Sequence, residues 1–331
     1  MGASGSARRI EQGRIACAND ETMKLLFYSP EKNPQPWLDE LASAIPGAEA
    51  WAWSPACADR QADYAVLWAP PAELFASQRQ LKAVFNIGAG VDGVMKLRNL
   101  PRGVPIVRLN DAGMAVQMAE YVCHAIFRHT RGFDAYENQA KNGKWKQHRP
   151  IERAGFPVGV MGLGEMGSRV ARAVAAFDYP TFGWSRGLKT LPGIHTFAGN
   201  AGLDEFLNQV RVLVCALPLT RETEGILNTA MLSKLKPHGY LINVARGKHL
   251  VENDLLALLD SGHLAGATLD VFREEPLPAT HAFWAHPKIT MTPHISALTL
   301  RAESVVQIAQ KIAALERGEA VEGVVEIARG Y

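Results

Sequence analysis

Short apolar runs alternate with longer amphipathic runs along most of the chain, beginning at Met23. A short apolar run bounded by turn residues predicts a buried strand, whereas apolar residues three or four positions apart predict a helix. Strands that alternate with helices predict a parallel sheet whose faces are covered by helices. The first four predicted strands are residues 24–28, 64–68, 83–87 and 106–109.

The middle of the chain begins with a long helical pattern without proline, residues 111–142. A helix of that length could pass from one domain to another. A second series of strands follows it, and six strands with helices between them match a doubly wound sheet. The predicted strands of this series are residues 158–161, 180–184, 212–217, 240–244, 267–271 and 289–292.

The end of the chain predicts one more amphipathic helix, residues 299–316, with Val305, Ile308 and Ile312 among its apolar positions. Its position indicates a return to the first domain. We therefore expect an α/β protein with two doubly wound parallel-sheet domains, in which a Rossmann cofactor domain is inserted into a flavodoxin-like substrate domain. The expected boundaries are 119–297 for the cofactor domain, 23–118 with 298–331 for the substrate domain, and 1–22 for a disordered extension or tag.

Composition narrows the class of protein. The 331 residues suffice for two domains, and 47% of them are hydrophobic, which argues against wholesale disorder. The 35 basic and 33 acidic residues form no long basic run, so nucleic-acid binding is disfavoured. No apolar run reaches the roughly 18 residues of a membrane span and no secretory signal is present, so we expect a cytoplasmic protein. Four widely spaced cysteines fit neither a zinc site nor a disulfide framework.

The sharpest local motif is Gly162-Leu163-Gly164-Glu165-Met166-Gly167, between a predicted strand and a predicted helix. In that context Gly162 permits a tight turn, Gly164 lets the backbone approach a pyrophosphate, and Gly167 lets the helix and strand pack closely. The helix N-terminus then offers free N–H groups and a partial positive charge to the phosphates. The motif therefore predicts a dinucleotide-binding site.

The end of the next strand indicates which dinucleotide binds. An NAD site usually has Asp or Glu there, hydrogen-bonded to the ribose 2′-hydroxyl. This chain has Trp184-Ser185-Arg186 at that place and Lys189 soon after, without a carboxylate. Because a carboxylate would repel a 2′-phosphate whereas a hydroxyl and a guanidinium would bind it, we expect NADP(H).

Three further segments follow predicted strands, at the edge where open α/β sheets bind their ligands. They contain Arg246 in Asn-Val-Ala-Arg-Gly, Glu275 in Asp-Val-Phe-Arg-Glu-Glu-Pro-Leu-Pro, and His294 in Thr-Pro-His. An arginine can hold a carboxylate bidentately, and a nearby carboxylate favours a protonated histidine. The three suit reduction of a 2-oxo acid, in which Arg246 binds and polarises the substrate, His294 donates the proton and Glu275 orients the imidazole.

Together with the glycine motif, these segments resemble the D-2-hydroxyacid dehydrogenase family from about Met23 to the end of the chain. Within that family the likeness is to the glyoxylate/hydroxypyruvate reductase A branch, through the Trp-Ser-Arg segment, Ser296-Ala297 and the C-terminal Ala-Arg-Gly-Tyr. The family often has an acidic residue where this chain has Ser185. The resemblance implies the three roles given above, a carboxamide contact for Asp270, and a homodimer. Further cofactor contacts are expected at Leu217, Pro218, Thr223, Val244, Ala245, Ser296 and Ala297.

The resemblance also places a glycine-rich loop, residues 87–92, at the active site. There the amides of Ala89, Gly90 and Val91 would bind the substrate carboxylate; the alternative is a plain strand-to-helix turn. Trp68 could line the same pocket or belong to the core. Trp145 is implied to reach a partner subunit. Residues 111–114 and 297–299 are implied hinges of a cleft that closes on the substrate.

The residues predict an NADPH-dependent reductase of small 2-oxo acids, without a metal. The resemblance implies that it converts glyoxylate to glycolate and hydroxypyruvate to D-glycerate. Two alternatives stay open. A related enzyme could act on another D-2-hydroxy acid such as 3-phosphoglycerate, although no extra basic residue stands near the 89–91 loop for its phosphate. A non-catalytic dinucleotide sensor or corepressor could share the fold. Loss of one of the three catalytic residues would favour that sensor, and all three are present.

Overall fold

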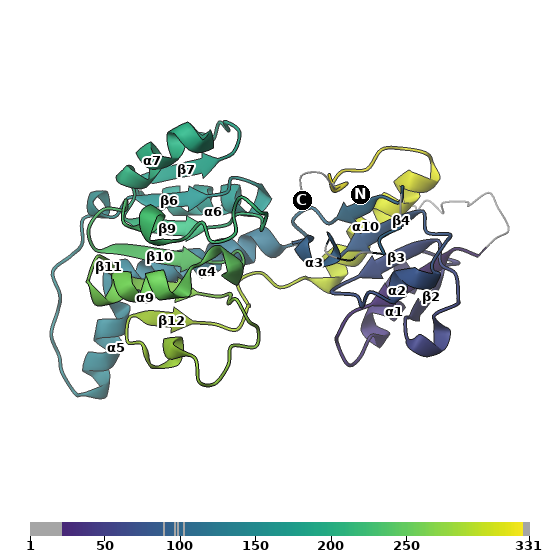
Figure 1. Cartoon of the computed structure of the whole chain (residues 1–331), viewed down its shortest axis with the longest axis horizontal. Coiled ribbons are helices and arrows are strands. Elements are labelled where there is room, and N and C mark those ends of the chain that lie inside the picture. Colours follow the sequence, from purple (N-terminus) through teal and green to yellow (C-terminus); the bar gives the residue numbers. More distant parts are fainter. Residues whose placement is uncertain (1–21, 89, 96, 98, 102, 327–331) are drawn as a thin grey trace, which may run out of the picture.

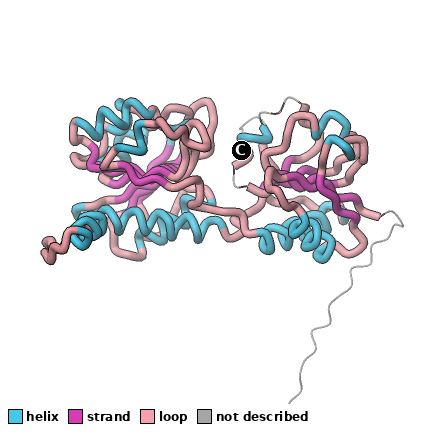
Figure 2. The backbone as a smooth tube through the Cα atoms, turned by 90° about the horizontal axis from the view of Figure 1, so that it is seen from below, coloured by secondary structure: helices cyan, strands magenta, loops and turns pink. Residues whose placement is uncertain are grey.

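The structure, a computed structural model, describes residues 22–326 except for residues 89, 96, 98 and 102. Two α/β lobes lie side by side, and the chain crosses between them twice (Figure 1). Each lobe has a parallel sheet between layers of helices (Figure 2). The predicted extension falls almost entirely outside the described residues, as does the Ala-Arg-Gly-Tyr ending.

The smaller lobe has a five-stranded parallel sheet in the order β2-β1-β3-β4-β5, which is the flavodoxin-like order. Its strands are β1 (Lys24–Tyr28), β2 (Glu49–Ala52), β3 (Tyr64–Leu67), β4 (Ala83–Asn86) and β5 (Ile106–Arg108). Its helices are α1 (Gln35–Ala44), α2 (Leu74–Ser77), α3 (Asp92–Met95) and α10 (Arg301–Glu316).

The larger lobe has a seven-stranded parallel sheet in the order β12-β11-β10-β9-β6-β7-β8. Counted from β6, this is the Rossmann order with one strand added at the end. The strands are β6 (Val158–Met161), β7 (Thr181–Ser185), β8 (His195–Ala198), β9 (Val212–Cys215), β10 (Gly239–Asn243), β11 (Leu264–Leu269) and β12 (Ile289–Met291). The helices are α4 (Met114–Arg131), α5 (Phe133–Lys141), α6 (Glu165–Ala175), α7 (Gly199–Gln209), α8 (Thr229–Leu232) and α9 (Glu252–Asp260).

The expected fold class is confirmed, and every predicted strand is present with its ends shifted by at most three residues. The sequence pattern missed two strands, β2 and β8. Each lies at the edge of its sheet and has only one buried residue, Trp51 in β2 and Phe197 in β8. A strand covered on so little of its surface has no continuous apolar run to reveal it.

The long helical pattern of residues 111–142 is not one helix, and this expectation is wrong. α4 ends where Gly132 adopts a left-handed conformation with φ of 62°, and α5 begins directly after it. A glycine adopts this conformation without the steric cost of a Cβ, so it ends a helix readily. α4 itself begins after three consecutive residues of positive φ, Asp111, Ala112 and Gly113.

The last helix, α10, joins the core of the smaller lobe. Its Val305, Ile308 and Ile312 are buried in one cluster with Leu25 and Phe27 of β1. The smaller lobe is thus completed by residues that follow the whole of the larger lobe in sequence.

Three of the four cysteines are described, and all three are free thiols. Burial raises the pKa of Cys123 to about 11 and that of Cys215 to about 12, so both stay protonated near neutral pH. Cys57 is half-buried, and Cys17 lies outside the described residues. No helix in the described part of the chain is long and apolar enough to cross a membrane.

Candidate active site

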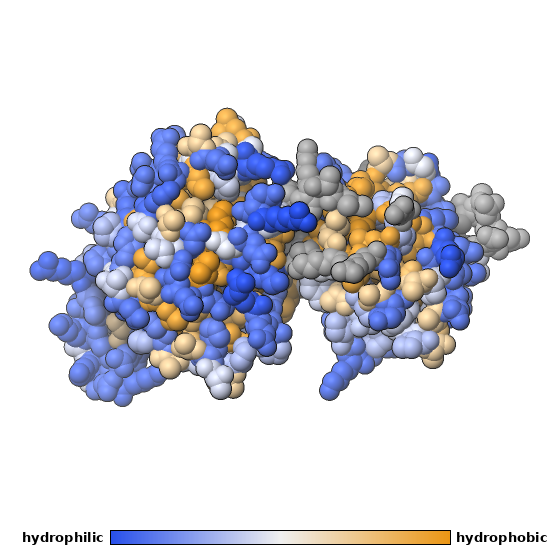
Figure 3. All heavy atoms as spheres, in the orientation of Figure 1, coloured by the Kyte–Doolittle hydropathy of each residue, from blue (hydrophilic) through white to orange (hydrophobic). Residues whose placement is uncertain are grey.

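A cleft of about 1080 Å³ lies between the two lobes. The larger lobe contributes the glycine motif and the carboxyl ends of β7, β9 and β10, and the smaller lobe contributes Gly90, Val91, Arg108 and Asn110. The space-filling view shows the two lobes separated by an indentation, with hydrophilic side chains over much of the larger lobe (Figure 3).

The glycine motif forms the turn from β6 into α6. Gly162 has φ of +97°, and a Cβ there would lie 2.6 Å from the carbonyl oxygen of Ala216. A Cβ on Gly167 would lie 1.7 Å from the carbonyl oxygen of Gly162, so only glycine lets α6 pack this closely. Gly164 differs, because a Cβ there would meet no protein atom within 4 Å. The open space before Gly164, at the N-terminus of α6, fits a pyrophosphate.

The residues expected to select the dinucleotide lie at the end of β7. Arg186 and Lys189 are exposed and line the cleft. Ser185 is buried, and its hydroxyl donates to the carbonyl oxygen of Gly187 at 2.7 Å, which shapes the turn. Sequence reasoning missed Glu222, which also lines the cleft. A hydrogen bond from Thr220 lowers the pKa of Glu222, and the positive charge of Arg186 lowers it further.

Most of the other positions expected to bind the cofactor also line the cleft. Trp184 is among them, although its indole is mostly buried and donates to the carbonyl oxygen of Gly199 at 2.9 Å. The remaining cleft-lining positions of this set are Leu163, Glu165, Met166, Leu217, Pro218, Thr223, Val244 and Ala245. The lining does not include Asp270, Ser296 or Ala297, nor two of the catalytic candidates, Glu275 and His294.

Arg246 reaches the cleft from the turn after β10. The fully buried Asn243 holds this turn, because its side chain donates to the carbonyl oxygen of Arg246 and accepts from the Ala245 N–H. A Cβ on Gly247 would lie 1.8 Å from the carbonyl carbon of Phe272. Gly247 therefore lets the turn that contains Arg246 press against the segment that leads to Glu275.

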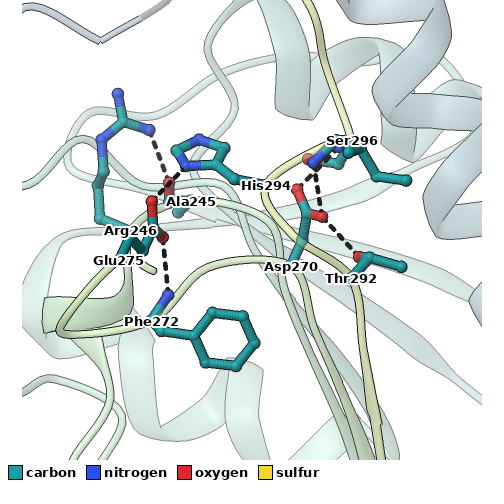
Figure 4. A network of polar contacts seen from close by, with 9 residues as sticks. Ala245, Arg246, Asp270, Phe272, Glu275, Thr292, His294 and Ser296 are labelled. Carbon is teal, nitrogen blue, oxygen red and sulfur yellow. Dashed lines mark hydrogen bonds and ion pairs between the residues drawn. The ribbon is translucent and has the colours of Figure 1, made fainter. Parts of the chain in front are cut away.

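Glu275 and His294 form a hydrogen-bonded pair, with Nδ1 of His294 2.8 Å from Oε2 of Glu275 (Figure 4). The other carboxylate oxygen accepts the N–H of Phe272 at 2.9 Å. Burial raises the pKa of Glu275, but these two hydrogen bonds and the charges of His294 and Arg246 outweigh it, so the pKa is lowered. Glu275 is thus an anion at neutral pH. With Nδ1 facing Glu275, Nε2 is the ring nitrogen that can give a proton to a bound molecule.

Asp270 holds the backbone on both sides of His294. Its carboxylate is fully buried, and Oδ1 accepts the Thr292 hydroxyl at 2.6 Å and the Ile295 N–H at 2.8 Å. Oδ2 accepts the Ser296 N–H at 2.8 Å (Figure 4). The backbone carbonyl of Asp270 accepts the His294 N–H, also at 2.8 Å. These bonds keep His294 at a positive φ of 56°.

The smaller lobe supplies the opposite wall of the cleft. Gly90 and Val91 line it, whereas Ala89 lies outside the described residues. Trp68 is half-buried and packs against Gly88, where an added Cβ would lie 1.8 Å from the indole ring of Trp68. Trp68 is not among the residues that line the cleft. Sequence reasoning missed Arg108, although it ends a parallel strand and the same rule that pointed to Arg246 applies to it.

The two interdomain crossings lie against each other at the start of α4. The side-chain amide of Gln117 donates to the carbonyl oxygens of Gly113 and Leu298, each at 2.9 Å. The expected hinge segments, 111–114 and 297–299, are therefore held together by one side chain. Trp145 lies far from them in the loop after α5, and it is 98% exposed.

The arrangement suits hydride transfer accompanied by proton transfer. A dinucleotide groove ends beside a guanidinium that can hold a carboxylate and a histidine that can supply a proton. Among the described residues no group of three His, Cys, Asp or Glu side chains is placed to hold a metal ion.

Comparison with known proteins finds relatives along most of the chain. Residues 123–296 match the model of the D-isomer specific 2-hydroxyacid dehydrogenase NAD-binding domain. The chain is 45% identical over 314 residues to glyoxylate/hydroxypyruvate reductase A of Serratia proteamaculans (strain 568), covering 93% of this chain and all of that protein.

Solved structures agree with the sequence relatives. A D-isomer specific 2-hydroxyacid dehydrogenase from Xanthobacter autotrophicus Py2, in complex with NADPH and MES, aligns with a TM-score of 0.89 and 37% identity over 94% of this chain and all of that one. An NADPH-dependent glyoxylate/hydroxypyruvate reductase from Sinorhizobium meliloti, in complex with NADP and sulfate, aligns with a TM-score of 0.88 and 39% identity over 93% of this chain and all of that one.

The two glycines of the motif should respond differently to alanine. The methyl group added in Gly164→Ala meets no protein atom, so the free energy of unfolding of this variant should stay within about 0.5 kcal/mol of the wild-type value. The added methyl would occupy the pyrophosphate space, so dinucleotide affinity should fall at least about tenfold. Gly167→Ala should instead lower stability, because its Cβ collides with backbone. Urea unfolding and calorimetric titration with NADPH check both; unchanged affinity in Gly164→Ala would contradict the assignment.

Proposed function

The chain belongs to the D-isomer specific 2-hydroxyacid dehydrogenase family, and we propose that it reduces glyoxylate and hydroxypyruvate to glycolate and D-glycerate with NADPH. The observation that supports this function best is the Glu275–His294 pair, which lies near Arg246, a residue that lines the cleft (Figure 4). The relative named glyoxylate/hydroxypyruvate reductase A, aligned over its full length, supports the choice of substrates.

Arg246 and the smaller lobe hold the substrate in this proposal. The guanidinium binds the carboxylate or the carbonyl oxygen of the 2-oxo acid and polarises the carbonyl group. The loop containing Gly90 and Val91 offers backbone N–H groups to the carboxylate from the other side of the cleft. A substrate gripped from both lobes draws them together and excludes water from the reacting carbon.

His294 supplies the proton. NADPH, when bound, provides the hydride that the carbonyl carbon receives. The oxygen of that carbonyl takes the proton from Nε2 of His294, which leaves a 2-hydroxy acid and a neutral imidazole. Nδ1–H of His294 stays hydrogen-bonded to Glu275, whose negative charge stabilises the imidazolium before transfer. The His294 side chain is 40% exposed, so solvent can return the proton afterwards.

NADPH rather than NADH fits the end of β7. Arg186 and Lys189 line the cleft there, and the strand ends without a carboxylate that would repel a 2′-phosphate. The structures aligned above that contain NADPH or NADP support the same choice.

We assign residues 119–297 to the cofactor domain and residues 23–118 with 298–331 to the substrate domain. This boundary falls within α4, whose Met114 packs in the core of the smaller lobe and whose Met118 packs in that of the larger lobe.

We also propose a homodimer. Trp145, almost fully exposed after α5, and the exposed Phe133 of α5 offer apolar surface to a second copy. Light scattering during size-exclusion chromatography should give twice the mass of one chain; a monomer at micromolar concentration would count against the dimer.

The substrate and cofactor are tested by following absorbance at 340 nm with a panel of 2-oxo acids. With glyoxylate and hydroxypyruvate, kcat/KM for NADPH should be at least about tenfold higher than for NADH. A tenfold preference corresponds to roughly 1.4 kcal/mol of binding free energy from the 2′-phosphate. Larger 2-oxo acids should react more slowly. Absence of turnover with every acid of the panel would instead favour a dinucleotide sensor.

Arg186→Ala should remove the preference for NADPH. The variant loses a charge-assisted hydrogen bond to the 2′-phosphate, worth about 1.5–3 kcal/mol, so KM for NADPH should rise roughly 10- to 100-fold. KM for NADH should not change. Arg172→Ala is the matched control, since Arg172 is an exposed arginine of α6 that does not line the cleft. An unchanged KM for NADPH in Arg186→Ala would remove this residue from the cofactor site.

Glu275→Gln should slow reduction without weakening cofactor binding. Glutamine can still accept the Phe272 N–H, but it has no negative charge to pair with His294. Because the proposed reaction takes its proton from His294, kcat with glyoxylate should fall roughly 10- to 100-fold at neutral pH while KM for NADPH stays the same. A kcat within about twofold of the wild type would remove Glu275 from the proton-transfer pair.

A further inference from the structure

A chain of hydrogen bonds connects α4 to the carboxylate behind His294. The Tyr121 hydroxyl lies 2.5 Å from Oγ1 of Thr292, and Thr292 donates to Oδ1 of Asp270 at 2.6 Å. Tyr121 is half-buried in α4, and Thr292 directly follows β12. Neither side chain lines the cleft, and the mechanism above uses neither of them.

The direction of these hydrogen bonds follows from the groups involved. A carboxylate only accepts, so the single hydrogen of the Thr292 hydroxyl points to Asp270. The hydrogen between Tyr121 and Thr292 must therefore come from Tyr121. Burial, with a contribution from the charge of Asp270, raises the pKa of Tyr121 to about 12, so the phenol keeps this hydrogen throughout the working range of pH.

The chain ends at the group that fixes the segment containing His294. The carboxylate of Asp270 also accepts the N–H groups of Ile295 and Ser296, and its backbone carbonyl accepts the N–H of His294. A fully buried carboxylate needs every donor that reaches it. Loss of the Thr292 hydroxyl would leave part of that charge unsatisfied and would loosen the other bonds.

The same face of α4 also holds the far end of the segment. Gln117 lies one helical turn before Tyr121, and its amide both donates to the carbonyl oxygen and accepts from the N–H of Leu298. α4 thus contacts residues 292–298 on either side of His294. α4 itself begins at one of the two crossings between the lobes.

We propose that Tyr121 and Thr292 are positioning residues for His294, acting through Asp270 to fix the height and orientation of the imidazole relative to the substrate carbonyl. This inference rests on the proposed reductase function. Tyr121 acts only through Thr292, and Thr292 acts only through Asp270. Misplacement by about 1 Å can slow a reaction roughly 100-fold, which sets the scale of the effect.

A second tyrosine–threonine pair, whose threonine lies on α4, provides a control. The Tyr179 hydroxyl lies 2.9 Å from Oγ1 of Thr130, and this threonine donates to the carbonyl oxygen of Ile126 within α4. The pair is more deeply buried than the first, and among the described residues its hydrogen bonds do not reach Asp270 or residues 292–298. Tyr179→Phe therefore measures what the loss of a buried tyrosine–threonine hydrogen bond does by itself.

The kinetic test compares five variants with glyoxylate and NADPH. Thr292→Val should lower kcat roughly 10- to 100-fold with little change in KM for NADPH, and Tyr121→Phe should lower kcat about three- to tenfold. The double variant should be no slower than Thr292→Val, because Tyr121 acts through Thr292. Thr292→Ser should restore most of the activity, and Tyr179→Phe should match the wild type. Additive losses in the double variant would overturn the proposal.

A second readout needs no activity. In the cofactor-free protein, amide hydrogen exchange at Ile295 and Ser296 should be faster in Thr292→Val and Tyr121→Phe than in the wild type, Thr292→Ser or Tyr179→Phe. Unchanged exchange in the first two variants overturns the proposal even where kcat falls. If the expected order of exchange holds and the wild type reduces no 2-oxo acid, the proposed function fails while the positioning of the segment stands.

Discussion

The site depends on the register of three parallel strands. β10, β11 and β12 are aligned so that Asn243 lies beside Leu269, and Leu269 beside Met291. Chain segments that leave parallel strands at the same level emerge next to one another, however far apart they are in sequence. Arg246, Asp270 with Glu275, and His294 follow these three strand ends. A shift of one register position would separate the histidine from its carboxylate partner.

Two carboxylates behind this edge have different tasks because their surroundings differ. Glu275 is partly exposed, faces the histidine ring and is kept ionised by the hydrogen bonds it accepts. Asp270 is fully buried, and its carboxylate oxygens accept hydrogen bonds from one hydroxyl and two backbone N–H groups. Glu275 pairs with the imidazole of His294, and Asp270 fixes the backbone on either side of it. Together, the hydrogen bonds of these two carboxylates hold His294 in place in the protein without a ligand.

Much of this organisation could be predicted from the sequence, because central parallel strands are continuous apolar runs and the glycine motif has a fixed geometry. The edge strands β2 and β8 could not, since each buries a single residue. The break at Gly132 was missed because apolar spacing continues through it, although the glycine itself was a signal. Glu222, Gln117 and Tyr121 were missed for another reason: their importance comes from partners distant in sequence, which only the packed structure brings to them.

The identity of the product tests the assembled site most directly. Hydroxypyruvate should be incubated with the protein and excess NADPH, and the glycerate formed should be resolved by chiral chromatography and counted against the NADPH consumed. A fixed order of Arg246, His294 and the hydride donor around one carbonyl presents a single face, so a single enantiomer should form, one molecule for each NADPH. The D-isomer specific family to which the chain belongs makes D-glycerate the expected enantiomer. A racemic product, L-glycerate, or consumption of NADPH without glycerate would contradict the arrangement of these residues as the reductive site.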